Sequence, residues 1–102
     1  MADEKQIFIA SRLTHGNFLF PLRIEVSHDR VTRVQPRFIG SEEESISISK
    51  VASVNIRTGL MWSDIRIDST GGTNPILSHG HSKADAQAIR DLIEKYQHNQ
   101  PA

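Results

Sequence analysis

Four arginines lie close together in the sequence, and they are the residues best suited to bind a phosphate. The segment LRIEVSHDRVTRVQPRF, Leu22 to Phe38, contains Arg23, Arg30, Arg33 and Arg37. A phosphate site needs several cations and free backbone amides that converge on one pocket. Here the arginines are spread over two predicted strands, on either side of a short turn at Ser27–Arg30 that also contains an acid, Asp29.

Three of these arginines follow the periodicity of a strand. Arg23, Arg33 and Arg37 alternate along the predicted strands, and a charged outward face is normal for a half-buried antiparallel sheet. Glu25 lies on the same predicted face as Arg23 and can pair with it. We therefore interpret the arginines as solvated surface charges. The alternative is a weak anion site formed by Arg23, Arg30, Arg33 and Arg37.

Two histidines, His79 and His81, flank Gly80 and could both reach one metal ion. Asp85 could supply a third ligand, but structural zinc sites usually need four protein ligands and catalytic sites three. The backbone offers a simpler interpretation, in which Gly80 lets the chain turn out of the last strand and His81 and Ser82 lead into a helix N-cap. We predict no metal site and no cofactor.

Catalytic motifs are missing from the sequence. It has no cysteine, and it contains no Gly-x-Ser-x-Gly, no Gly-x-x-x-x-Gly-Lys-Ser/Thr and no His-Glu-x-x-His. Serine, histidine and aspartate are plentiful, but a catalytic triad is an arrangement in space that a sequence does not display. We predict that the protein is not an enzyme, and a small hydrolase or metal-dependent enzyme is the least favoured alternative.

The remaining candidate site is apolar. Leu60, Met61 and Trp62 are three bulky residues in a predicted turn between strands. Tryptophan and methionine are enriched in protein interfaces, which makes this turn a candidate interface. In the other interpretation, Trp62 folds back over the open end of the core. The sequence does not decide between the two.

The elements that position these residues are mostly strands. In FLFPLRIEVS, one face of a predicted strand carries Phe18, Phe20, Leu22, Ile24 and Val26. Later strands are predicted in RVTRVQPRFI, SISIS, VASVNIRTG, SDIRIDS and NPILSH, with Ala52, Val54 and Ile56 pointing inward in the third of these. The segment Gln6–Leu13 is either a further strand or a lead-in. The acids Glu42–Glu44 are predicted in a loop, and Thr70–Thr73 is predicted as a hairpin turn.

After Gly80, apolar residues recur with the spacing of an α-helix. An apolar stripe is formed by Ala84, Ala88, Ile89, Leu92, Ile93 and Tyr96, which predicts a helix from Lys83 to about His98 with Ser82 before it as the cap. The order of elements predicts an α+β fold that is mainly β. We expect six to seven antiparallel strands in a bent sandwich or partly open barrel, capped by the C-terminal amphipathic helix. By length, residues 1–102 form a single domain.

The composition narrows the classes of partner. The chain has 12 Lys and Arg, 12 Asp and Glu, and a pI near 7.0. Nucleic-acid binders normally carry a net basic charge, so neutrality argues against nucleic acid as a partner. The first residues carry acids where a signal peptide needs bases, and no apolar run approaches the roughly 20 residues of a membrane span. We predict a cytoplasmic location.

Taken together, these elements resemble a bacterial pleckstrin-homology-like domain over about residues 17–97. The resemblance rests on the element order, on ESISISKVASVNIRTGL and DIRIDSTGG, and on a pattern I-x-I-x-K-I-x-S-V matched by Ile46, Ile48, Lys50, Val51, Ser53 and Val54. Eukaryotic members carry a tryptophan in the closing helix, whereas the only tryptophan here is Trp62. Lipid-binding members hold inositol phosphates in a long basic loop between the first two strands. We assign that connection to Ser27–Arg30, which is too short to enclose a headgroup.

The resemblance also implies a function. Related bacterial domains assemble into closed rings, which implies a homo-oligomer. We predict a non-catalytic protein-interaction module that self-associates, with any other protein partner unknown. The alternative is a peripheral module that binds anionic lipid or a membrane surface, which is less favoured because the charge is mixed.

Overall fold

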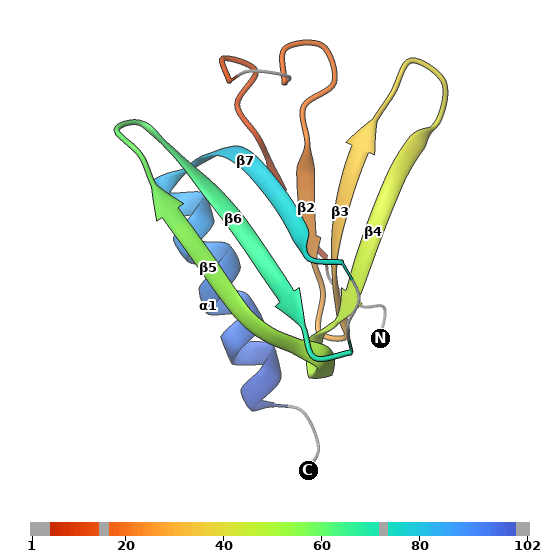
Figure 1. Ribbon diagram of the computed structural model, residues 1–102, viewed down its shortest axis with the longest axis vertical. Coiled ribbons are helices and arrows are strands. Elements are labelled where there is room, and N and C mark those ends of the chain that lie inside the picture. Colours follow the sequence, from red (N-terminus) through yellow and green to blue (C-terminus); the bar gives the residue numbers. More distant parts are fainter. Residues whose placement is uncertain (1–4, 15–16, 72–73, 100–102) are drawn as a thin grey trace.

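The structure is a computed structural model that describes residues 5–14, 17–71 and 74–99. Over these residues, seven strands are followed by one α-helix (Figure 1). The strands are β1 (Gln6–Ile9), β2 (Arg23–Val26), β3 (Arg30–Pro36), β4 (Ser41–Ser47), β5 (Val51–Thr58), β6 (Trp62–Ser69) and β7 (Ile76–Ser82). A 3₁₀ turn, η1 (Ile48–Lys50), joins β4 to β5, and the helix is α1 (Lys83–His98).

The strands form two antiparallel sheets. Sheet A has the order β1-β2-β3-β4 and sheet B has the order β5-β6-β7. The predicted α+β fold, with its antiparallel strands and C-terminal helix, is confirmed. The sheets meet near η1 and splay apart toward the other end of the molecule (Figure 1). Within the described residues no strand pair links sheet A to sheet B, so the two sheets do not close into a barrel.

Apolar and polar residues alternate along the strands, which places the apolar side chains in the core. Val31 of β3 lies opposite Val26 of β2 and Ile46 of β4, so these three valine and isoleucine side chains share one face of sheet A. In sheet B, Ile65 and Ile67 of β6 are almost wholly buried. The sheets and the helix together enclose an apolar cluster of Ile24, Val26, Val31, Ile46, Ile48, Val51, Ile65, Ile67, Ile76, Ala86, Ile89 and Ile93.

The helix has the predicted bounds and the predicted cap. Ser82 Oγ accepts a hydrogen bond from the backbone N–H of Asp85 at 3.1 Å, which satisfies one of the free donors of the first turn. The buried face is formed by Ala86, Ile89 and Ile93. Ala84 was predicted in this stripe and is exposed instead, because the centre of the buried face is displaced around the helix toward Ala86.

Two predictions about sheet A are wrong. Phe18 was placed on the buried face of a strand, but β2 begins only at Arg23 and Phe18 is 70% exposed. The acids Glu42–Glu44 were placed in a loop and lie in β4. Because β4 is an edge strand with β3 as its one neighbour, it tolerates charges that would be costly in a central strand.

Irregular strand pairing explains why two sequence predictions about sheet B are wrong. The β5–β6 register shifts between Val51 and Ser53, and Ala52, predicted to point inward, is exposed. Gly80 does not turn the chain out of the last strand but lies inside β7, opposite a register shift in β6. Its φ is +90°, and a Cβ there would overlap the Thr14 hydroxyl, so glycine suits this position on two counts.

Two further observations complete the fold. Thr70 lies at the predicted hairpin turn, but Gly72 and Thr73 fall outside the described residues. No helix in the described part of the chain has the length and apolar character needed to cross a lipid bilayer.

Candidate functional site

Arg33 lies on the inner face of sheet A, which corrects the prediction that it points outward. Arg33 pairs with Ile24 in the β2–β3 register and follows Val31 by two residues, so all three share one face. Its side chain is only 17% exposed, and Nη1 donates to Glu44 at 2.9 Å. The β3–β4 register places Glu44 directly opposite Arg33, so the partly buried cation has a partner from the neighbouring strand.

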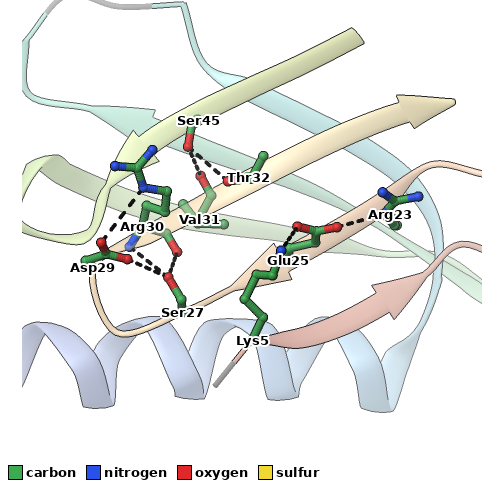
Figure 2. A network of polar contacts seen from close by, with 9 residues as sticks. All are labelled: Lys5, Arg23, Glu25, Ser27, Asp29, Arg30, Val31, Thr32 and Ser45. Atoms are coloured by element: carbon green, nitrogen blue, oxygen red, sulfur yellow. Dashed lines mark hydrogen bonds and ion pairs between the residues drawn. The ribbon is translucent and has the colours of Figure 1, made fainter. Parts of the chain in front are cut away.

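Arg23 lies on the opposite face, in a charged row at the surface. Its Nε donates to Glu25 at 2.8 Å, and Lys5 Nζ donates to the same carboxylate at 3.2 Å (Figure 2). Burial alone would raise the pKa of Glu25, but the hydrogen bonds from Arg23 and Lys5 outweigh it and hold the pKa of this carboxyl below its usual value. The predicted Arg23–Glu25 pair is therefore present.

The β2–β3 turn is closed by its own side chains. Ser27 Oγ donates to Asp29 at 2.6 Å, and the Arg30 guanidinium lies 4.0 Å from the same carboxylate (Figure 2). The hydrogen bond from Ser27 lowers the pKa of Asp29, with a smaller contribution from Arg30. A hollow of about 440 Å³ beside this turn is lined by Lys5, Glu25, Ser27, Asp29, Arg30, Thr32, Glu43 and Ser45. It holds more acids than bases, which is unfavourable for a phosphate.

Arg37 also faces an acid, with Nη2 3.3 Å from Glu42. Each of the four candidate arginines thus has a carboxylate within 4.0 Å. They do not converge on one point, because Arg23 and Arg33 lie on opposite faces of sheet A and Arg30 and Arg37 lie at opposite ends of β3.

The connection between the first two strands was misassigned. Because Gln6–Ile9 is a strand, that connection is residues 10–22, and Ser27–Arg30 joins β2 to β3. Arg12 is its single arginine or lysine, and Nη1 of Arg12 donates to the Phe18 carbonyl at 2.8 Å. This connection is therefore longer than the sequence predicted, and it contains one arginine among apolar and neutral polar residues.

The two histidines that were considered as metal ligands are in different environments. His81 is fully buried, and Nε2 of its ring shares a hydrogen bond with Ser78 Oγ at 2.7 Å. Burial lowers the pKa of His81; nearby Asp85 acts in the opposite direction and His79 in the same one. His79 is exposed, and its carbonyl accepts from Asn17 at 3.2 Å. In the described residues no group of three or more His, Asp or Glu is placed to hold a metal ion.

A second hollow is an open groove of about 1240 Å³. It is lined by Asn17, Leu22, Arg33, Gln35, Asn55, Ile56, Arg57, Asp64, Ile65, Arg66, Asp68, Leu77, Ser78 and His79. Several charges in it are already paired, as where Arg66 Nε donates to Asp68 at 3.0 Å. That hydrogen bond lowers the pKa of Asp68. The strand register also places Arg57 opposite Asp64 in this groove, so acids and bases lie side by side across the strands of sheet B.

The candidate interface lies at the tip of the β5–β6 hairpin. Leu60 and Met61 form a two-residue turn, closed by the Gly59 N–H donating to the Trp62 carbonyl at 2.8 Å. Leu60 is 93% exposed and Met61 is 66% exposed. Trp62 was placed in the loop but begins β6, where it pairs with Ser82 and is half-buried. Leu60 and Met61 thus project from a base that Trp62 helps to form.

Two more apolar tips were missed from the sequence. Phe38 and Ile39 are the central residues of the β3–β4 turn, which is closed by the Arg37 N–H donating to the Gly40 carbonyl at 3.0 Å. Phe38 is 89% exposed and Ile39 is 86% exposed. In the β1–β2 connection, Phe18 and Leu19 are about as exposed as Met61. The available signal was a pair of bulky apolar residues between Pro36 and Gly40, since turn centres normally carry polar residues or glycine.

Comparison with known proteins supports the fold. No family model matches the chain, and no curated protein matches it. Among solved structures, the chain is similar to a DUF1696 family protein with a pleckstrin-homology domain from Shewanella loihica PV-4. The TM-score is 0.60 at 14% identity, and the match covers 95% of this chain and 85% of that one. The chain therefore has a bacterial pleckstrin-homology-like fold, as the resemblance predicted.

Proposed function

We propose that this protein is a non-catalytic, cytoplasmic interaction module of pleckstrin-homology-like fold that associates with further copies of itself. The observation that supports this proposal is the β5–β6 tip. Leu60 and Met61 expose 93% and 66% of their surface on a closed two-residue turn, above a half-buried tryptophan. Methionine and aromatic residues are enriched in protein interfaces, which makes Met61 and Trp62 suitable anchors with Leu60 beside them.

The arginines favour this proposal over an anionic-lipid module. All four are within 4.0 Å of a carboxylate, so binding a headgroup phosphate would require an existing ion pair to be exchanged. The balanced charge of the chain also removes long-range repulsion between copies. An interface centred on an apolar tip requires no ion pair to be exchanged and meets no long-range charge repulsion between copies.

A sheet edge of a second copy is a suitable partner for the tip. β5 is an edge strand of sheet B, and β1 and β4 are the edges of sheet A. Edge strands present unpaired backbone groups, and β4 carries three consecutive acids that oppose pairing with another strand. A contact between the β5–β6 tip of one copy and a different surface of the next is heterologous, and it closes into a ring if the rotation permits.

Light scattering over a range of protein concentrations tests the proposal. The unmodified chain should form an oligomer, and Leu60→Ser combined with Met61→Ser should dissociate it, because truncating an interface anchor often costs roughly 2 kcal/mol or more. Leu77→Ser is the matched control, since Leu77 is also an exposed apolar residue but lies in β7.

Trp62→Ala separates an interface role from a structural one. Dissociation with a cooperative melting curve would place Trp62 in the interface, whereas unfolding would make it part of the core. A monomeric unmodified chain at all concentrations would contradict self-association.

A further inference from the structure

A small buried polar cluster lies at the base of the β5–β6 tip. The β6–β7 register pairs Ser63 with His81, and both residues are fully buried. Ser78 is also buried, and its Oγ shares a hydrogen bond with Nε2 of the His81 ring at 2.7 Å. The neighbouring pair in the register is Trp62 with Ser82. The cluster therefore adjoins the tryptophan that supports the tip.

Two atoms of this cluster have no hydrogen-bond partner within the described residues. They are Ser63 Oγ and Nδ1 of the His81 ring. A neutral imidazole carries one N–H, so the bond to Ser78 leaves Nδ1 as either an unused donor or an unused acceptor. Buried polar groups are nearly always paired, and an unpaired one makes the packed arrangement less stable. The cluster is thus only partly satisfied while the ring is neutral.

A proton on His81 changes this balance. Both ring nitrogens of an imidazolium are donors, so Nδ1 then requires an acceptor, and Ser63 lies opposite it on β6. The charge lies directly before Ser82, the N-cap of α1, where the positive end of the helix dipole opposes it. Within the described residues, Asp85 of α1 favours the protonated ring and His79 of β7 opposes it, whereas β6 faces it with the neutral Ser63.

The backbone beside His81 is suited to a local rearrangement. Gly80 has a φ of +90°, and the β6–β7 register shifts between Ser63 and Asp64. A bulge of this kind interrupts the ladder of hydrogen bonds between the strands. The strand pairs between the bulge and the tip can therefore loosen while the rest of sheet B stays paired.

We infer that His81 is a pH-sensitive element at the base of the tip, and that protonation of its ring loosens the pairing around Ser63 and exposes Trp62. The inference rests on the proposed function, since loosening this base displaces Leu60 and Met61 from the position in which they contact a second copy. Burial lowers the pKa of His81 below its ordinary value of 6.5, so the proton binds more readily to the loosened arrangement. Acidification below that value therefore shifts the population toward the loosened arrangement and weakens self-association.

The chain contains a single tryptophan, so the fluorescence of Trp62 reports directly on the base of the tip. Between about pH 7.5 and about pH 5, its emission should move to longer wavelength, while far-UV circular dichroism stays nearly constant because the strands and the helix remain. His81→Gln should abolish the shift, and His28→Gln in the exposed β2–β3 turn is the matched control. NMR titration of the His81 ring in the unmodified chain should give the same midpoint as the emission, which tests the link even if His81→Gln does not fold.

Light scattering over the same pH range tests the consequence for self-association, and the oligomer should be lost as the emission shifts. Constant emission, a shift that persists in His81→Gln, or emission and circular dichroism that change at one midpoint would each overturn the inference. An oligomer that persists while the emission shifts would show that the base of the tip does not control the contact. A chain that is monomeric at every pH would contradict the proposed function, and the emission would still decide whether His81 controls Trp62.

Discussion

The two ends of the strands are closed by residues of opposite character. At the upper end in Figure 1, the turns present Phe18 and Leu19, Phe38 and Ile39, and Leu60 and Met61. At the lower end, the β2–β3 turn is Ser27–Arg30, and in η1 the exposed residues are Ser49 and Lys50. Both ends are made by the same antiparallel strands, so strand geometry does not require the difference. The proposed self-association through Leu60 and Met61 uses the upper end, so the comparison of the two ends can be tested by substitutions at each.

The largest effect is expected at the base of the apolar end. Gly80→Ala should destabilise the fold by roughly 2–5 kcal/mol, because alanine there combines an unfavourable φ with overlap against the Thr14 side chain. Gly40→Ala is the matched control at the β3–β4 tip, where φ is also positive but nothing lies within 4 Å. It should cost only about 1–2 kcal/mol. Urea unfolding measures both, and equal losses would contradict the close contact at Gly80.

A pH effect of intermediate size is expected from the buried histidine. Burial lowers the pKa of His81 from its ordinary value of 6.5, so the unfolded chain binds a proton more readily than the folded one. Stability should therefore fall as the pH is lowered below about 6.5, by at most about 1.4 kcal/mol per pH unit. The pKa values of the carboxyls of Glu25, Asp29 and Asp68 are also lowered, and these groups affect stability in a more acidic pH range. Thermal melts of the unmodified chain and His81→Gln should differ in slope between pH 7 and 5.5, and parallel curves would exclude His81 as the cause.

A small effect on stability is expected at the apolar tips themselves. Phe38→Ser with Ile39→Ser should change the free energy of unfolding by no more than about 0.5 kcal/mol, since both side chains are almost fully exposed. A marked destabilisation in urea would instead show that the tips support the fold.

The smallest effect is expected at the polar end. Asp29 is fully exposed, and its contacts with Ser27 and Arg30 are surface interactions. Asp29→Asn should leave self-association unchanged in light scattering and shift the melting temperature least in the series. Dissociation of the oligomer by Asp29→Asn would remove the functional distinction between the two ends.

Local patterns predicted the regular parts of this molecule well. Alternation placed Ile24 and Val26 in the core, and Ser82 marked the start of α1. The failures arise from distant contacts. Phe18 is exposed because buried Asn17 bonds to the carbonyl of His79, 62 residues away along the chain. The positions of Ala52 and Gly80 depend on irregular pairing between strands, which the periodicity of a single strand does not reveal.

The candidate site was predictable only in part. The exposure of Leu60 and Met61 follows from their turn, whereas the half-burial of Trp62 depends on its pairing with Ser82 of another strand. Arg33 could have been assigned correctly, since it follows buried Val31 by two residues. The position of its partner Glu44 could not be assigned, because the run Glu42–Glu44 was interpreted as a loop.

The last turn of α1 imposes an order on synthesis and folding. The Gln97 side-chain amide donates to the carbonyls of Val51 at 2.8 Å and Ile48 at 3.2 Å, at the point where the chain passes from sheet A to sheet B. These partners lie 46 and 49 residues away along the sequence. A growing chain therefore contains the passage between the sheets long before it contains the amide that completes it. Until Gln97 has been added, the Ile48 carbonyl still accepts from the Val51 N–H within η1, but the helix cannot yet bond to the joint between the sheets.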